Sequence, residues 1–227
     1  MEYIKEYRYE KKFLERGVSK EEIIHIIKMN PVLFKEKYHQ RQINNIYFDT
    51  INKKNYHENI EGNSERFKIR IRWYGTEFKK VNKPVLEIKI KKGELGRKLS
   101  FPLKPFVFNS SFCFDSLKDI FQESSLPFWL IEKLRLYVPA LVNSYKRQYF
   151  QSSNKKFRIT VDWDLSFFEV KKQKNLFNNR YSESETKIIE LKYNSVDYQD
   201  APEISSHLPF RLVASSKYVS GIDFLNN

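Results

Sequence analysis

The sequence predicts an α+β fold in which roughly eight antiparallel strands close into a β-barrel tunnel with a polar, basic interior and a few peripheral helices. The first observation is strict alternation of charged and apolar residues, a period that places successive side chains on opposite faces of a strand. The clearest such strand carries Arg66, Lys68, Arg70 and Arg72 on one face. The second observation is that similar alternation recurs in three later segments. About eight strands can enclose a space wide enough for a small ligand.

The remaining elements follow from turn and cap signals. Strands are expected at residues 3–13, 43–50, 65–74, 85–92, 97–103, 141–150, 156–163 and 187–193. Ser19 and Glu22 form a capping box that begins a helix, which ends at Asn30-Pro31. Segments 116–122 and 127–137 are expected to be helical, 51–64 to be a loop, and 171–186 to be a mobile polar insertion. We expect one domain over residues 1–227 and assign no element to the C-terminal tail.

Composition limits the possible functions. The chain has 227 residues, a formal net charge of +13, 41% hydrophobic and 16% aromatic residues. A disordered chain is therefore not expected, and the charge favours an anionic partner. The only cysteine, Cys113, excludes an intramolecular disulfide and a thiolate zinc cluster. We see no signal peptide and no run of about 20 apolar residues, so we expect a cytoplasmic protein without a membrane segment.

The polar strand faces predict the chemistry of the interior. Like charges two residues apart repel one another unless a polyanion neutralises them. Further cations on these faces are Arg8, Lys12, Lys89, Lys98, Arg158 and Lys192. The few acids among them suit a hard divalent cation: Glu10, Glu87, Asp162 and Glu190. These faces therefore predict a site that holds phosphates together with a metal.

Eight short motifs, in order along nearly the whole chain, resemble one family. They are Tyr9-Glu10-Lys11-Lys12-Phe13, Tyr47-Phe48-Asp49-Thr50, Arg70-Ile71-Arg72-Trp73-Tyr74-Gly75, Leu86-Glu87-Ile88-Lys89, Tyr145-Lys146-Arg147, Arg158-Ile159-Thr160-Val161-Asp162, Glu190-Leu191-Lys192-Tyr193 and Ser216-Lys217-Tyr218. Together they resemble the vacuolar transporter chaperone (VTC) domain. This domain is the polyphosphate polymerase branch of the triphosphate tunnel metalloenzymes, also called the CYTH superfamily.

The resemblance implies an eight-stranded antiparallel tunnel that binds ATP, triphosphate or polyphosphate with Mn²⁺ or Mg²⁺. By position, the phosphate-binding residues would be Lys12, Arg70, Arg72, Lys89, Lys98, Arg147 and Lys217. Tyr145 and Ser216 would be neutral phosphate donors, and Glu190 a metal ligand, with Glu10 or Asp162 as its possible companion. Arg97 competes with Lys98, but Lys98 shares its face with Ser100 and is preferred. The alternation adds Arg8, Arg66, Lys68, Arg158 and Lys192 to the substrate-binding set.

One departure bears on the reaction. Triphosphatases of the superfamily carry Glu-x-Glu-x-Lys on the first strand, where this chain has Arg8-x-Glu10-x-Lys12. Replacing an acid by Arg removes a metal ligand and adds a phosphate donor, which favours a polyphosphate polymerase over a hydrolase. The eukaryotic relatives also carry a phosphate-sensing module and a membrane anchor, so the resemblance implies a separate membrane or regulatory partner.

Several alternatives stay open at the level of sequence. Glu190 could serve only in a salt bridge, Asp162 as a strand-end cap, and Tyr145 as barrel filling. An inorganic triphosphatase, an NTP phosphohydrolase or a polyphosphate sensor without turnover would carry similar residues. A single-stranded nucleic-acid platform is disfavoured, because its aromatic residues should share the cationic face, whereas Trp73 lies opposite Arg72.

Overall fold

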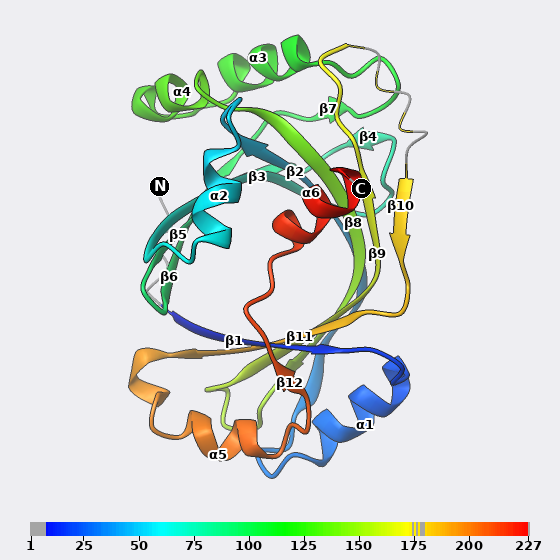
Figure 1. The fold of residues 1–227 in the computed structure, drawn as a ribbon, viewed down its shortest axis with the longest axis vertical. Helices are drawn as coiled ribbons and strands as arrows, with labels where there is room; N and C mark the ends of the chain where they lie inside the picture. The colour runs from blue at the N-terminus through cyan, green and yellow to red at the C-terminus, as the bar shows by residue number, and fades with distance from the viewer. Residues whose placement is uncertain (1–7, 174, 176, 178–179, 227) are drawn as a thin grey trace.

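One closed antiparallel sheet dominates the computed structural model, which describes residues 8–173, 175, 177 and 180–226. Eight strands form the ring, and in ring order they are β9 (Arg158–Phe168), β11 (Lys187–Asn194), β1 (Arg8–Glu15), β6 (Leu95–Pro102), β5 (Val85–Lys92), β3 (Glu65–Tyr74), β2 (Lys35–Asp49) and β8 (Val138–Gln151). Strand β8 pairs back onto β9 and closes the ring. Figure 1 looks into this ring. The predicted fold class is confirmed; residues 3–7 of the first predicted strand lie outside the described part.

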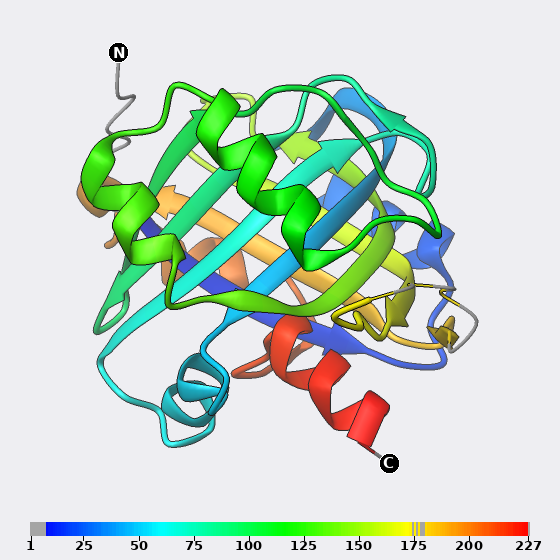
Figure 2. The same cartoon turned by 90° about the horizontal axis from the view of Figure 1, so that it is seen from above.

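The apolar faces of the ring point outward and are covered by helices on two sides. On one side, α3 (Phe114–Glu123) and α4 (Phe128–Leu134) lie over an outer cluster that includes Ile69, Ile71 and Trp73. On the other side, α1 (Lys20–Met29) and α5 (Ala201–Ser206) cover a cluster that includes Ile159 and Ile189. Figures 1 and 2 show these two layers on opposite sides of the ring. The polar strand faces are thereby turned toward the centre of the ring.

Helix α1 forms as its sequence signals predict. Ser19 accepts from the backbone N–H of Glu22, and the Glu22 carboxylate accepts from the backbone N–H of Ser19. Ile23 and Ile27, one turn apart, are buried in the cluster that covers β9 and β11. The helix ends at Asn30, whose side chain donates to the Ile204 carbonyl near α5.

A helix that the sequence did not predict fills one end of the ring. Helix α6 (Lys217–Asn226) lies across the centre of the view in Figure 1. Its Tyr218 and Ile222 are buried in a cluster with interior residues of β2, β8, β9 and β11. A Cβ added at Gly221 would lie 2.5 Å from side-chain atoms of both Leu141 and Phe167, so only glycine lets the helix seat this deeply.

Other segments also differ from the predictions. The predicted loop 51–64 contains α2 (Lys54–Ile60), and the predicted mobile insertion contains β10 (Arg180–Glu183), which pairs with β9. The short elements are β4 (Lys80–Val81), β7 (Phe106–Val107), β12 (Arg211–Leu212) and the 3₁₀ helix η1 (Ser195–Asp197). Strand β2 begins at Lys35 rather than at the predicted residue 43, and strand β9 continues to Phe168 rather than ending at residue 163. Within the described residues, no helix has the length and apolar character needed to cross a membrane.

Candidate functional site

The interior of the ring gathers the charged residues that the sequence singled out. They are Arg8, Glu10 and Lys12 on β1; Arg66, Lys68, Arg70 and Arg72 on β3; Lys89 on β5; Lys98 on β6; Tyr145 and Arg147 on β8; Arg158 and Asp162 on β9; Glu190 and Lys192 on β11; and Ser216 and Lys217 where α6 begins. Contacts between strands that are not neighbours show that these faces meet. Arg72 on β3 donates to the Tyr145 hydroxyl on β8, at 3.2 Å, and Lys89 on β5 pairs with Glu10 on β1, at 2.9 Å.

Glu87 organises one group of cations. Its Oε2 lies 2.7 Å from Nη2 of Arg70 and 3.6 Å from Nη1 of Arg72, and its Oε1 accepts from Lys98. Although burial opposes it, these three cations hold the pKa of Glu87 well below its usual range. Lys98 faces Lys89 across the strand pair, which puts it on the interior face, whereas Arg97 pairs with Ile90 on the outer face. The preference for Lys98 over Arg97 therefore agrees with the geometry.

A second group surrounds Asp162 and Glu190. Arg147 donates to both oxygens of Asp162, with Nη2 2.6 Å from Oδ2, and its Nη2 also lies 3.2 Å from Glu190. Lys217 Nζ lies 2.5 Å from Asp162 Oδ2 and 3.8 Å from Glu190 Oε1. Against the effect of burial, Arg147 and Lys217 lower the pKa of Asp162. Asp162 is completely buried, and cations occupy both of its oxygens.

Glu10 and Glu190 each direct one carboxylate oxygen toward the ammonium group of Lys12. The Lys12 ammonium lies 3.4 Å from Glu10 Oε1 and 4.0 Å from Glu190 Oε1, and it donates to the Ser215 carbonyl at 2.7 Å. Lys89 and Lys192 pair with the other oxygens of the two acids. Within the described residues, no three His, Cys, Asp or Glu side chains form a ready-made metal cage. Two carboxylates that face one cation do suit a divalent metal that takes its other ligands from phosphate and water.

One part of the interior has cations without matching acids. Among the described residues, the Lys68 ammonium has one hydrogen-bond partner, the Ser216 hydroxyl, 2.7 Å away, and burial followed by repulsion from Lys12 and Lys89 places its pKa well below the usual value. The Nε atoms of Arg8 and Arg66 are buried and have no hydrogen-bond partner among the described residues. This surplus of positive charge is the expected property of a site that binds a polyanion.

Two neutral residues that were not predicted from the sequence, Asn45 and Tyr47, orient the arginines. Asn45 Oδ1 accepts from Arg72 Nε at 3.0 Å, and the Tyr47 hydroxyl lies 3.1 Å from Arg70 Nη1. Both belong to β2, where Asn45, Tyr47 and Asp49 alternate with apolar residues from Ile46 to Phe48. This short alternation was the signal that could have identified them. Trp73, as expected, lies outside the ring, buried against Phe108.

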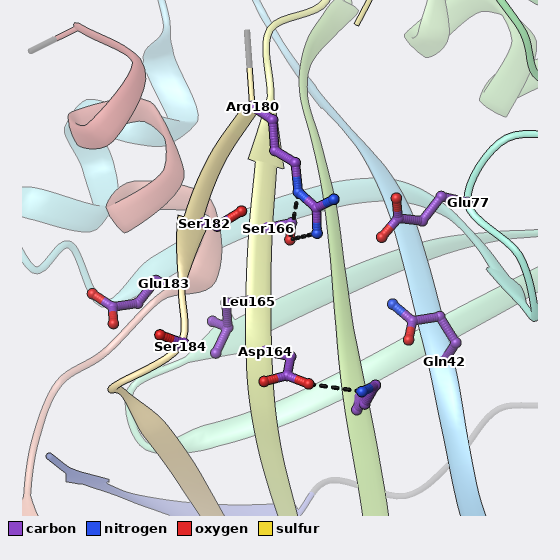
Figure 3. Close-up of a pocket in the computed structure, with 10 residues that line it drawn as sticks. Gln42, Glu77, Asp164, Leu165, Ser166, Arg180, Ser182, Glu183 and Ser184 are labelled. Atoms are coloured by element: carbon purple, nitrogen blue, oxygen red, sulfur yellow. Dashed lines mark hydrogen bonds and ion pairs between the residues drawn. The ribbon is translucent and has the colours of Figure 1, made fainter. Parts of the chain in front are cut away.

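A separate polar pocket of about 320 Å³ lies on the outer surface of the ring (Figure 3). Arg180 points into it and donates to the Ser166 hydroxyl at 2.8 Å, while Lys146 pairs with Asp164 at 2.8 Å. Glu77 and Glu183 add negative charge to its lining. The lining thus holds two cations, Lys146 and Arg180, and three acids, Glu77, Asp164 and Glu183, so this pocket lacks the positive surplus that marks the interior.

Comparison with known proteins agrees with the fold. A family model for the VTC domain matches residues 7–226. A candidate adenylate cyclase from Vibrio parahaemolyticus has a TM-score of 0.54 at 10% identity, covering 96% of this chain and 98% of its own. A candidate adenylyl cyclase from Hippeastrum, described as having a dominant triphosphatase activity, has a TM-score of 0.53 at 11% identity, covering 97% and 96%. The PH1819 protein from Pyrococcus horikoshii has a TM-score of 0.52 at 13% sequence identity, and the match covers 97% of this chain and 99% of that protein. No curated protein sequence matches significantly.

Proposed function

The chain belongs to the VTC domain family, and we propose that it is a phosphotransferase of the polyphosphate polymerase type. It would bind ATP or triphosphate, and polyphosphate, inside the ring together with Mn²⁺ or Mg²⁺. The observation that carries this proposal is the positive surplus around Lys68: among the described residues, the partly buried Lys68, Arg8 and Arg66 form no ion pair with an acid. Desolvated cations of this kind are costly in an empty protein and favourable once an anion lies between them.

The guanidinium groups of Arg70 and Arg72 are pre-organised for phosphate binding. Glu87, Asn45 and Tyr47 fix the guanidinium groups of Arg70 and Arg72, so these groups lose little freedom on binding. Planar guanidinium groups can donate two parallel hydrogen bonds to phosphate oxygens. Arg147 on β8 and Lys217 at the start of α6, both paired with Asp162, would supply further positive charge to the same phosphates. Phosphoryl transfer needs little more from a protein than such positioning and charge stabilisation.

Glu190 and Glu10 are the residues that would hold the divalent metal. Each offers an oxygen toward the same point, now faced by Lys12, and phosphate oxygens and water would complete the coordination. Asp162 is a poor ligand, because Arg147 and Lys217 already occupy both of its oxygens; we assign it the role of positioning these cations. When bound, the metal would supply charge neutralisation on the transferring phosphoryl group.

Growth of a polyphosphate chain requires no protein base. A terminal phosphate oxygen of the chain attacks the γ-phosphorus of ATP, the bond from that phosphorus to the β–γ bridging oxygen breaks, and ADP leaves. Arg8, in place of a first-strand acid, favours this reaction over attack by water. Hydrolysis is the second candidate, because the similarly folded Hippeastrum protein is described as a triphosphatase.

The deciding experiment is incubation of the purified protein with ATP and Mn²⁺. Gel electrophoresis detects polyphosphate, and a colorimetric assay detects free phosphate. Polyphosphate formation supports a polymerase, and free phosphate alone supports a hydrolase. Binding of tripolyphosphate without either product would overturn the enzymatic proposal and indicate a sensor. Arg72→Ala serves as the disabled variant, and Arg135→Ala, at an exposed position directly after α4, as the matched control.

A further inference from the structure

Three tyrosines and one arginine form a cluster at the end of the ring that α6 leaves free. We call Tyr38, Tyr74, Tyr149 and Arg41 the tyrosine mouth. The Arg41 guanidinium lies 4.7 Å from the ring centroid of Tyr38, 5.5 Å from that of Tyr74 and 5.7 Å from that of Tyr149. Tyr38 meets Tyr149 edge to face at 5.7 Å. One cation thus holds three aromatic rings around itself.

The tyrosine mouth shares the cationic face of the sheet. Tyr74 comes two residues after Arg72 on β3, and Tyr149 two residues after Arg147 on β8. Arg41 on β2 lies directly opposite Arg147 in the register of β2 and β8. The Arg147 guanidinium is 6.0 Å from the centroid of the Tyr149 ring, so the tyrosine mouth lies directly beside the interior cations. Trp73 points out of the ring and cannot stack on a ligand inside it. Tyr74 and Tyr149, in contrast, lie on the same strand faces as the interior cations.

Two of these tyrosines, Tyr38 and Tyr74, are not explained by core packing, whereas Tyr149 is partly buried and packs against the interior cluster that contains Tyr145 and Tyr218. Tyr38 is 44% exposed and Tyr74 is 52% exposed, and neither belongs to the apolar clusters. An exposed aromatic ring held by a guanidinium group presents a rigid π surface with a hydrogen-bond donor beside it. Planar heteroaromatic bases stack on such surfaces, and stacking accepts any base because every base has a π face.

We propose that the tyrosine mouth binds the base of a nucleoside triphosphate whose phosphates extend into the ring. This inference rests on the proposed function, since it assumes that the interior cations bind phosphate. It adds a means of distinguishing a nucleotide donor from inorganic triphosphate, which has nothing to stack. The cluster is centred on one guanidinium group, which suits one base rather than a strand of nucleic acid. A purine, with its larger π surface, should bind better than a pyrimidine.

The test compares two ligands by isothermal titration calorimetry without metal. ATP and inorganic tripolyphosphate are titrated into the wild type, Tyr74→Ala and Tyr38→Ala. Loss of a stacking ring should weaken ATP binding about 5- to 100-fold in each variant and change tripolyphosphate binding by less than about twofold. Tyr74→Phe should bind ATP like the wild type, because it keeps the ring. Phe128→Ala, which removes a 77% exposed ring on the outer helix α4, is the matched control and should change neither affinity.

The outcomes separate this inference from the proposed function. If both tyrosine variants lose affinity for ATP and tripolyphosphate equally, the mouth only shapes the phosphate site and the inference is wrong. It is equally wrong if ATP binding is unchanged, or if the wild type binds tripolyphosphate and not ATP; phosphate binding in the ring would survive all three results. If the wild type binds neither ligand, the proposed function fails and the inference fails with it.

Discussion

Arg147 and Asp162 form a buried ion pair in which one guanidinium group donates to both carboxylate oxygens. Lys217, from the start of α6, contacts Asp162 Oδ2 at 2.5 Å. The carboxylate thereby joins β8, β9 and the C-terminal helix at a single point. Because the Asp162 carboxylate is buried and bonded to both Arg147 and Lys217, it fixes the positions of these two cations, which would otherwise repel each other. We therefore expect Asp162 to position these two cations rather than to bind the metal.

Asp162→Asn should therefore destabilise the fold strongly. The amide keeps the size of the carboxylate but leaves Arg147 and Lys217 buried without their counter-charge, which typically costs about 3–5 kcal/mol. Urea unfolding measures the loss. The control is Asp164→Asn, which breaks the exposed pair with Lys146 and should change stability by less than about 1 kcal/mol. Equal stability of Asp162→Asn and the wild type, together with a lost Mn²⁺ response, would make Asp162 a metal ligand instead.

Glu190→Gln should separate phosphate binding from metal-dependent chemistry. Removing this charge also removes a repulsion toward bound phosphate, so tripolyphosphate affinity without metal should hold steady or rise. Turnover with Mn²⁺ should fall at least ~100-fold, because metal stabilisation contributes several kcal/mol.

The matched control for Glu190→Gln is Glu87→Gln, since Glu87 is an equally cation-paired acid outside the proposed metal set. Titration of Mn²⁺ should show a changed metal dependence for Glu190→Gln and an unchanged one for Glu87→Gln. Near-normal turnover of Glu190→Gln would move the metal to Glu10. Global unfolding of Glu190→Gln at 25 °C would favour a purely structural salt bridge with Lys192 and Arg147.

Arg70→Ala and Arg72→Ala should each weaken tripolyphosphate binding by about 1.5–3 kcal/mol, the typical worth of a charge-assisted hydrogen bond. The fold should survive, since Glu87 keeps Lys98 and the remaining arginine as partners. Calorimetric titration of both variants, with Arg135→Ala as a surface-charge control, measures the effect. Normal affinity in either variant would remove that residue from the phosphate site.

The strand faces could be predicted from the sequence because a period of two determines which side chains meet. Arg70, Arg72, Lys89 and Glu190 needed only this rule and the closure of the ring. The extension of β9 could not be found in this way. Asp164 adopts a left-handed backbone, with φ of 51°, and the residues that follow, Leu165 and Phe167, pack with α6 inside the ring. An irregularity of this kind breaks the alternation on which the prediction depended.

The helices that were missed have weak local signals. Helix α6 contains Ser220 and Gly221, both unfavourable within a helix, and its stability comes from packing inside the ring. Helix α2 is polar and is held by Asp49, whose Oδ1 accepts from the backbone N–H of Asn55 at 2.9 Å. The same tertiary contacts place Ser216 and Lys217 at the site. The strand alternation could not predict this placement; only the Ser216-Lys217-Tyr218 motif of the VTC resemblance pointed to these two residues.

Lys68→Gln should stabilise the ligand-free protein and weaken polyphosphate binding. The partly buried Lys68 ammonium is repelled by Lys12 and Lys89, so without a bound anion its charge opposes folding. The melting temperature should rise by roughly 2–4 °C for each kcal/mol of repulsion removed. Differential scanning calorimetry and tripolyphosphate titration measure the two effects. If stability and affinity both fall, Lys68 is held by a favourable contact that the Ser216 hydroxyl alone does not explain.

Binding of ATP should weaken as pH rises above about 8. Burial, partly opposed by Glu87, lowers the pKa of Lys98 to about 8 in the ligand-free protein. Bound phosphate favours the protonated form, so the pKa of Lys98 rises in the complex and binding takes up protons above this pH. The γ-phosphate, with its second ionisation near about 6, stays fully charged throughout. The contribution of Lys98 to ATP affinity is then complete below pH 8. It is lost as the pH rises toward the pKa that Lys98 has in the complex with ATP.

The same shift should act on stability with the opposite sign. Because the pKa of Lys98 is lower in the folded protein than its unfolded value of about 10.4, the unfolded chain binds more protons between these values, and the ligand-free fold gains stability with rising pH there. Lys98→Arg, which stays charged, should reduce the pH dependence of ATP affinity and the pH dependence of stability. Calorimetry at pH 7–10, in two buffers of different ionisation enthalpy, measures the proton uptake directly. An Lys98→Arg variant with the wild-type proton uptake would show that Lys68 or Lys89, whose pKa values burial also lowers, is the titrating group.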